Sequence, residues 1–186
     1  SFNKLGNATP KIQSPEYFAS AFNAVQDLVE KSLLLAAHDV SAGGLITTLL
    51  EMTFANTEGG LAINLDGFEE KDIVKILFAE NNALVAQVED EKAVDEILDK
   101  AGIKYIKIGG TQEERTILVD KAGKEYMFGI DYLRDVWFKS SYLLDRKQSG
   151  NKCAKSRFEN YKKQPIKYKF PKGFDGKLST IGISGS

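Results

Sequence analysis

The stretch His38 to Gly44, with the sequence HDVSAGG, constrains the fold of this chain more than any other and contains its only histidine. It lies between the apolar run Leu33 to Ala37 and a helix-like stretch from Leu45 to Ala55. The apolar run has the length of a buried strand, and two glycines let the backbone turn tightly before a helix begins. Since α/β folds bind ligands at such strand ends, the sequence predicts a ligand-binding loop here.

The side chains of this loop suit an anionic ligand carried with a metal ion. Asp39 offers the anionic oxygen that a hard cation prefers, while the Ser41 hydroxyl and the amides before the helix can face phosphate. The alternative is that Asp39 and Ser41 only cap the next helix and that His38 is a half-buried polar residue. Because short motifs of this kind often occur by chance, the residues alone leave both readings open.

Length and charge limit the classes to which the chain can belong. Its 186 residues, 42% of them hydrophobic, can bury one core and carry an extended tail. The 25 basic and 26 acidic residues create no basic field for nucleic acid, and no apolar run approaches membrane-spanning length. The single cysteine, Cys153, fits a reducing cytosol, so we expect a cytoplasmic protein. Because Ser1 is no initiator, we expect the edge of an excised fragment.

Hydrophobic periodicity predicts strands and helices that alternate along the chain. Strands are expected at 33–37, 61–65, 83–88, 105–108, 116–119 and 125–128. Helices are expected from Ser14-Pro15 through Val29 and at 45–54, 73–78, 91–100 and 133–144. Glu51, on an otherwise apolar helix, lies either at the solvent edge or pointed at another group, and the solvent edge is the commoner case. The simplest fold is an α/β (α+β) domain in which helices pack on one mixed β-sheet.

From Arg146 onward the composition becomes basic and aromatic, with prolines at 165 and 171. The expected organisation is a lead-in segment at 1–13, a domain at 14–145 and an extended linker at 146–186. We expect this linker to lie on a neighbouring domain and to contact its own core less than any earlier segment does. Arg134, just before it, could hold an anion, although a solvated helix arginine is more frequent.

Three motifs in order carry a family resemblance: His38 to Leu45, then Leu50-Glu51-Met52-Thr53-Phe54-Ala55, then Leu77-Phe78-Ala79-Glu80. They resemble the phosphoribosylformylglycinamidine synthase family, and specifically the carboxy-terminal domain of the second synthetase half in its long single-chain form. The resemblance runs from about Asn3 to Cys153-Ala154. It implies the fold of the carboxy-terminal domain of aminoimidazole ribonucleotide synthetase.

The resemblance implies an ATP-dependent carbon-nitrogen ligase of purine biosynthesis. Such a ligase converts formylglycinamide ribonucleotide, ATP and glutamine to formylglycinamidine ribonucleotide, ADP, phosphate and glutamate. Partners would be the other synthetase half and a glutaminase domain, starting near Leu178 to Ser184, with no nucleic acid or membrane. Asp39 would bind Mg²⁺ and Ser41 would contact ATP or ADP. Further candidates for this site are His38, Gly43, Gly44 and Glu80.

Two departures from the family pattern indicate a structural rather than a catalytic nucleotide site. Ala42 stands where the family commonly has an aspartate, and Asn81 and Ala83 replace a second acid and a glycine near Glu80. Other readings are an aminoimidazole ribonucleotide synthetase-like domain, a selenophosphate synthetase-like domain, or a non-catalytic scaffold. The tail after Arg146 favours the first reading, because those shorter enzymes are not expected to continue toward a further domain.

Overall fold

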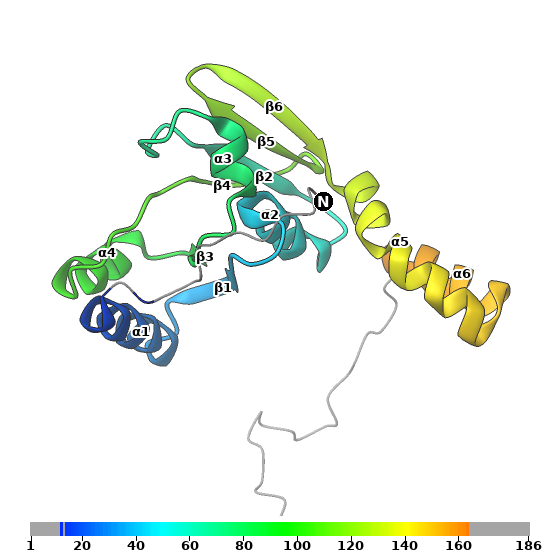
Figure 1. Ribbon diagram of the computed structural model, residues 1–186, viewed down its shortest axis with the longest axis horizontal. Coiled ribbons are helices and arrows are strands. Elements are labelled where there is room, and N and C mark those ends of the chain that lie inside the picture. The colour runs from blue at the N-terminus through cyan, green and yellow to red at the C-terminus, as the bar shows by residue number, and fades with distance from the viewer. Residues whose placement is uncertain (1–11, 13, 164–186) are drawn as a thin grey trace, which may run out of the picture.

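The structure is a computed structural model that describes residue 12 and residues 14–163 (Figure 1). Its helices are α1 (Pro15–Glu30), α2 (Gly44–Phe54), α3 (Ile73–Phe78), α4 (Glu91–Lys100), α5 (Ile130–Ser149) and α6 (Asn151–Glu159), followed by the 3-10 turn η1 (Asn160–Lys162). Its strands are β1 (Leu34–Asp39), β2 (Gly60–Asn64), β3 (Leu84–Val88), β4 (Gly109–Gln112), β5 (Thr116–Lys121) and β6 (Lys124–Gly129).

A mixed sheet with helices packed against it forms the centre of the domain, as expected for an α/β (α+β) fold. Its order is β4-β2-β5-β6, in which β2 and β5 are parallel and the other neighbours are antiparallel. Leu65, Ile117 and Val119 are fully buried in the core beside this sheet. The expected hairpin is confirmed as β5 and β6, which turn through Ala122 and Gly123, both with positive φ.

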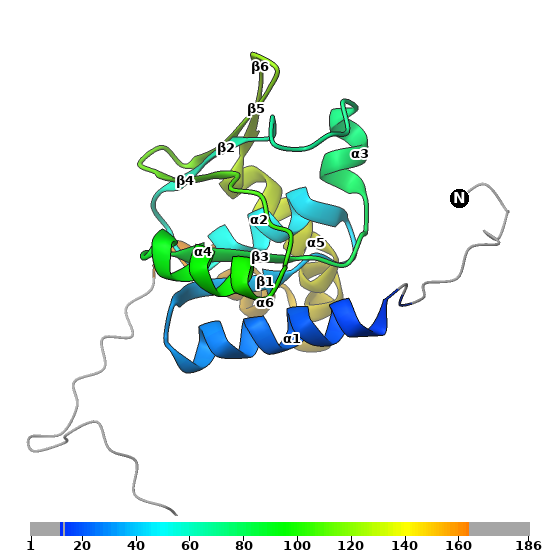
Figure 2. The same cartoon turned by 90° about the vertical axis from the view of Figure 1, so that its left-hand side faces the viewer.

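The expectation of a single sheet is wrong, because β1 and β3 pair antiparallel with each other in a separate two-stranded ribbon. Figure 2 shows this ribbon close to α1 and α4, at the opposite end of the molecule from β5 and β6. The run before His38 was expected to be covered on both faces, yet Leu35 is 58% exposed. Antiparallel pairing explains the difference, since it allows one face of a ribbon to remain open.

The strand expected at Tyr105 to Ile108 is also absent, and β4 begins only at Gly109. Lys107 instead makes ion pairs with Glu91 (3.0 Å) and Asp95 (2.7 Å) of α4. These contacts join the segment to α4, while its last residue, Ile108, accepts a hydrogen bond from the Asn64 amide of β2 (2.7 Å).

Helix α2 connects the ribbon to the core, and its predicted position directly after the HDVSAGG loop is confirmed. Leu45, Ile46 and Leu49 are buried, and the helix packs against both α3 and α5. Gly44 permits this packing, because a Cβ there would lie 2.7 Å from the carbonyl oxygen of Leu77 and the φ angle is +72°. Any other residue would therefore push α2 and α3 apart.

The basic region does not become irregular at Arg146 as expected. Helix α5 continues to Ser149, and α6 folds back along it after a turn at Gly150 (φ +81°). Arg157 bonds Asp145 across this turn (2.6 Å), and Ala154 is buried between the helices. The rest of the expected linker, 164–186, and the lead-in at 1–11 and 13 lie outside the described residues.

Arg134 is neither a solvated residue nor an evident anion site. It is buried, donates a hydrogen bond to the Phe158 carbonyl (3.1 Å), and lies 4.3 Å from the ring centroid of Phe138. Its guanidinium therefore ties α5 to α6. Within residue 12 and 14–163, no helix is both long and apolar enough to cross a bilayer.

Candidate functional site

The HDVSAGG loop leaves the end of β1 and is fixed to both neighbouring elements. The Val40 amide donates to the Ala83 carbonyl beside β3 (2.8 Å), and the Thr48 hydroxyl of α2 donates to the Asp39 carbonyl (3.1 Å). Thr48 is itself buried. These bonds satisfy the backbone groups on either side of the Asp39–Val40 peptide and so fix the backbone from which the Asp39 side chain projects.

His38 links the loop to the middle of α2. Its Nδ1 donates to the Asp39 carbonyl (2.7 Å), because a carbonyl oxygen only accepts. Its Nε2 lies 3.4 Å from Glu51 Oε2, and the two side chains are 33% and 23% exposed. Of the two readings of Glu51, the structure therefore supports the less common one, because the side chain points at His38. An acid on an otherwise apolar helix was the sequence signal for this contact.

The two glycine amides that were expected to face phosphate already have acceptors within the chain. The Gly43 amide donates to Glu80 Oε1 (2.9 Å), and the Gly44 amide donates to the Ser41 carbonyl (3.0 Å). The structure thus brings Glu80 to the loop, as the resemblance implied, but as a partner of Gly43. A ligand that approaches the loop meets the side chains of Asp39 and Ser41 first.

Asp39 and Ser41 are the exposed polar groups of the loop. The side chain of Asp39 is 75% exposed, and Ser41 is also at the surface. Within the described part of the chain, no group of three His, Cys, Asp or Glu residues is arranged to hold a metal ion. Mg²⁺ commonly binds through one or two carboxylates together with phosphate oxygens and water. The donor set at this loop therefore fits Mg²⁺ when a nucleotide supplies the remaining oxygens.

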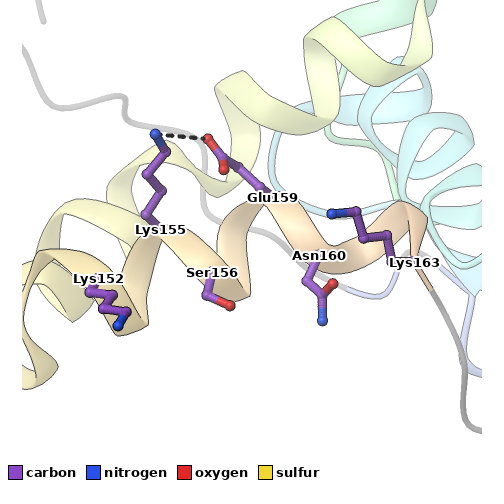
Figure 3. A pocket seen from close by; sticks show the side chains of 6 residues that line it. All are labelled: Lys152, Lys155, Ser156, Glu159, Asn160 and Lys163. Atoms are coloured by element: carbon purple, nitrogen blue, oxygen red, sulfur yellow. Dashed lines mark ion pairs between the residues drawn. The ribbon is translucent and has the colours of Figure 1, made fainter.

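An open hollow of about 1510 Å³ adjoins the loop, and Val40, Leu45 and Asn81 are among its lining residues. It is larger than the usual small-molecule pocket of about 300–1,000 Å³. A second depression of about 310 Å³ lies on α6 and η1, far along the chain from the loop (Figure 3). Three of its six lining residues are lysines, and Lys155 there lies 3.7 Å from Glu159. Exposed lysines alone define no binding site.

Arg115 stabilises the C-terminal end of α2, and no pattern in the sequence had indicated this role. Arg115 donates to the carbonyls of Thr53, Gly59 and Asn56 at 2.7–3.1 Å, and it pairs with Asp131 at 3.2 Å. Burial raises the pKa of Asp131, but hydrogen bonds from Lys162 and Arg115 outweigh it and hold that pKa below its usual value. Arg115 therefore joins the end of α2 to the start of α5, and so steadies the helix that begins at the loop.

The fold and loop together define an α+β domain with a polar, glycine-turned loop at the start of a buried helix. Residues 4–121 match the sequence family described as "AIR synthase related protein, C-terminal domain". The chain belongs to this family.

Curated relatives carry one consistent name. The chain is 34% identical over 160 residues to "Phosphoribosylformylglycinamidine synthase" of Homo sapiens, covering 82% of this chain and 12% of that protein. It is 30% identical over 183 residues to the protein of the same name from Dictyostelium discoideum, covering 88% and 13%. The chain thus spans about an eighth of the length of these relatives.

Solved structures support the same fold. "T. maritima PurL complexed with ATP" superposes with a TM-score of 0.58 at 20% identity, covering 66% of this chain and 22% of that one. "T. maritima PurL complexed with FGAR" gives a TM-score of 0.58 at 21% identity, covering 69% and 23%. The expected likeness to the phosphoribosylformylglycinamidine synthase family and its domain fold is confirmed.

Proposed function

We propose that this chain is the carboxy-terminal domain of a synthetase half in a long phosphoribosylformylglycinamidine synthase. The whole enzyme would convert formylglycinamide ribonucleotide to formylglycinamidine ribonucleotide with ATP, and glutamine would supply the nitrogen. The sequence match to curated relatives of this name supports the proposal. Its partners would be the other synthetase half and a glutaminase domain of the same chain, in a reducing cytoplasm, and the fragment alone would be inactive.

Within that enzyme, the HDVSAGG loop would hold an adenine nucleotide with Mg²⁺. The observation that carries this assignment is the exposed Asp39 carboxylate, held on a loop whose backbone is already bonded to Thr48 and Ala83. Asp39 would bind the cation, and Ser41 would donate its hydroxyl to the nucleotide. His38, Gly43, Gly44 and Glu80 would shape the loop from behind, because their polar groups bond within the chain.

The nucleotide here would stabilise the fold rather than react. Ala42 and Asn81 supply no carboxylate, and the exposed Glu80 accepts the Gly43 amide at Oε1, so Asp39 has fewer acidic neighbours than the family pattern provides. A ligand that binds only the folded state stabilises it by about 2.7 kcal/mol at a hundredfold excess over its dissociation constant. Because the loop bonds to buried Thr48 of α2, a nucleotide bound at the loop would also stabilise the packing of α2 in the core.

The replacement Asp39→Asn in the full-length enzyme tests this proposal, because it keeps the side-chain shape and removes the charge. We expect Mg²⁺-dependent nucleotide retention to fall and the melting temperature to drop in the presence of nucleotide. Turnover measured well below the melting temperature should change little. The matched control is Asp27→Asn, which makes the same change at an exposed position on α1.

Two results would count against the proposal in different ways. Loss of turnover with unchanged melting would mean that the site is catalytic rather than structural. Unchanged melting together with unchanged nucleotide content would mean that this loop holds no nucleotide.

A further inference from the structure

One side of α5 carries large apolar side chains that the described residues leave open to solvent. Apolar residues recur along this helix at helical spacing, as they do on helices that face a core. In the structure these side chains are instead between 45% and 73% exposed. They are Tyr132, Val136, Trp137, Leu143 and Leu144.

These side chains lie on one side of the helix, although Leu133, which stands between two of them on that side, packs on the core of the domain. At 3.6 residues per turn, their positions fall within an arc about 140° wide around the helix axis. Helices that face a core have an apolar stripe of at least about 100°. Lys147 is the charged residue inside this arc, while Arg134, Asp135 and Asp145 project on the other side. The exposed side of α5 therefore has the width and composition of a buried helix face.

The opposite side of α5 is already in use. Phe158 of α6 stacks on Tyr142 with ring centroids 4.6 Å apart, and Arg134 bonds the Phe158 carbonyl. The two helices project together away from the sheets, as Figure 1 shows. The apolar face is thus not an incomplete contact with α6. One edge of it already touches the domain, because Trp137 packs on Phe54 of α2 with ring centroids 5.8 Å apart, and the rest is open to solvent.

The comparisons indicate what covers this face. The family match ends at residue 121, before α5 and α6 begin. A continuous match over 88% of this chain, as with the Dictyostelium relative, must include both helices. The helix pair therefore lies outside the family domain. It is shared with a relative of which the whole matched region makes up only 13%.

We propose that the apolar face of α5, defined by those five side chains, docks against an apolar surface of another domain of the same polypeptide. The inference rests on the proposed function in one respect, that this chain is part of a longer enzyme. A second copy of the chain is the competing occupant. It is disfavoured because the helix pair accompanies long chains whose other domains are covalently present at high effective concentration.

Thiol labelling of the full-length protein tests the proposal. Val136→Cys and Leu144→Cys place probes on the face, and Val74→Cys on α3 is the matched control, since Val74 is a helical valine that is exposed to a similar extent. Each labelling rate is divided by the rate at the same cysteine in the urea-unfolded chain. We expect positions 136 and 144 to label at least about tenfold more slowly than position 74, at every protein concentration.

Rates at positions 136 and 144 within about twofold of the rate at position 74 would overturn the proposal, because the face would then be free. Protection that disappears on dilution would also overturn it, in favour of a second copy. Nucleotide content of the same samples separates this inference from the nucleotide site. Protection at α5 without bound nucleotide would uphold docking while the nucleotide proposal fails.

Discussion

Replacing Gly44 by alanine should destabilise the domain more than alanine at Gly102 or Gly110, where a new Cβ would meet open space. Gly44 has a φ of +72°, a conformation that costs an L-residue about 1–2 kcal/mol. Its new Cβ would also lie 2.7 Å from Leu77 O and 2.8 Å from Phe78 Cα, which are backbone atoms that cannot rotate away. Overpacking of this kind costs about 1–3 kcal/mol, so we expect a total loss of about 2–5 kcal/mol.

Two other glycines separate the contributions of strain and contact. Gly102 has a φ of +66° and open space around its position, so Gly102→Ala should cost only the conformational part, about 1–2 kcal/mol. Gly110 has open space and no positive φ, so Gly110→Ala should be close to neutral. Urea unfolding of the three variants measures these differences through the midpoints at unchanged slope. Equal losses for Gly44→Ala and Gly102→Ala would refute the contact between α2 and α3.

Two further predictions concern side chains that hold the loop and the helices. Glu80→Ala should lower the free energy of unfolding by about 1–3 kcal/mol, because the Gly43 amide loses its acceptor. Glu80→Gln keeps an oxygen there and should lower it less. Equal free energies of unfolding for the two variants would contradict this role of Glu80. Asp131→Asn should also lower stability at neutral pH, by about 1–3 kcal/mol, since Arg115 and Lys162 lose an anionic partner. Because the pKa of Asp131 is lowered by folding, the stability it adds is present above the usual value of 3.8 and is lost as pH falls through the lowered pKa. The difference in free energy of unfolding between wild type and Asp131→Asn should therefore disappear in acid. A difference that stays constant from pH 7 to pH 2 in urea unfolding would contradict this role of Asp131.

Helices and turns that are marked by a capping or turn residue close by in the chain could be predicted from the sequence. Ser14 caps α1 with its side chain, and Asp90 does the same for α4, as residues of these types commonly do. Gly123 lies in the turn of the β5–β6 hairpin, where the backbone has a positive φ. These features depend on residues only a few positions apart, so one sequence is enough to indicate them.

Features that depend on distant parts of the chain could not be predicted in this way. Nothing local to Leu33–Ala37 reveals whether a second layer covers the strand, and the isolated pairing of β1 with β3 left it exposed. The contact of Glu80 with the Gly43 amide joins residues 37 positions apart. Helix α6 was not predicted, because its sequence is rich in lysine and only a few of its residues, Ala154 and Phe158 among them, pack against α5.

A crystal structure of the full-length protein with an adenine nucleotide and Mn²⁺ in place of Mg²⁺ is the most direct test of the nucleotide site. We expect an anomalous peak for Mn²⁺ at direct coordination distance from an Asp39 carboxylate oxygen, which is about 2.1 Å for Mg²⁺. Nucleotide density should lie within hydrogen-bond distance of the Ser41 hydroxyl. Nucleotide and metal bound elsewhere in the protein, with the HDVSAGG loop empty at saturating ligand, would contradict it.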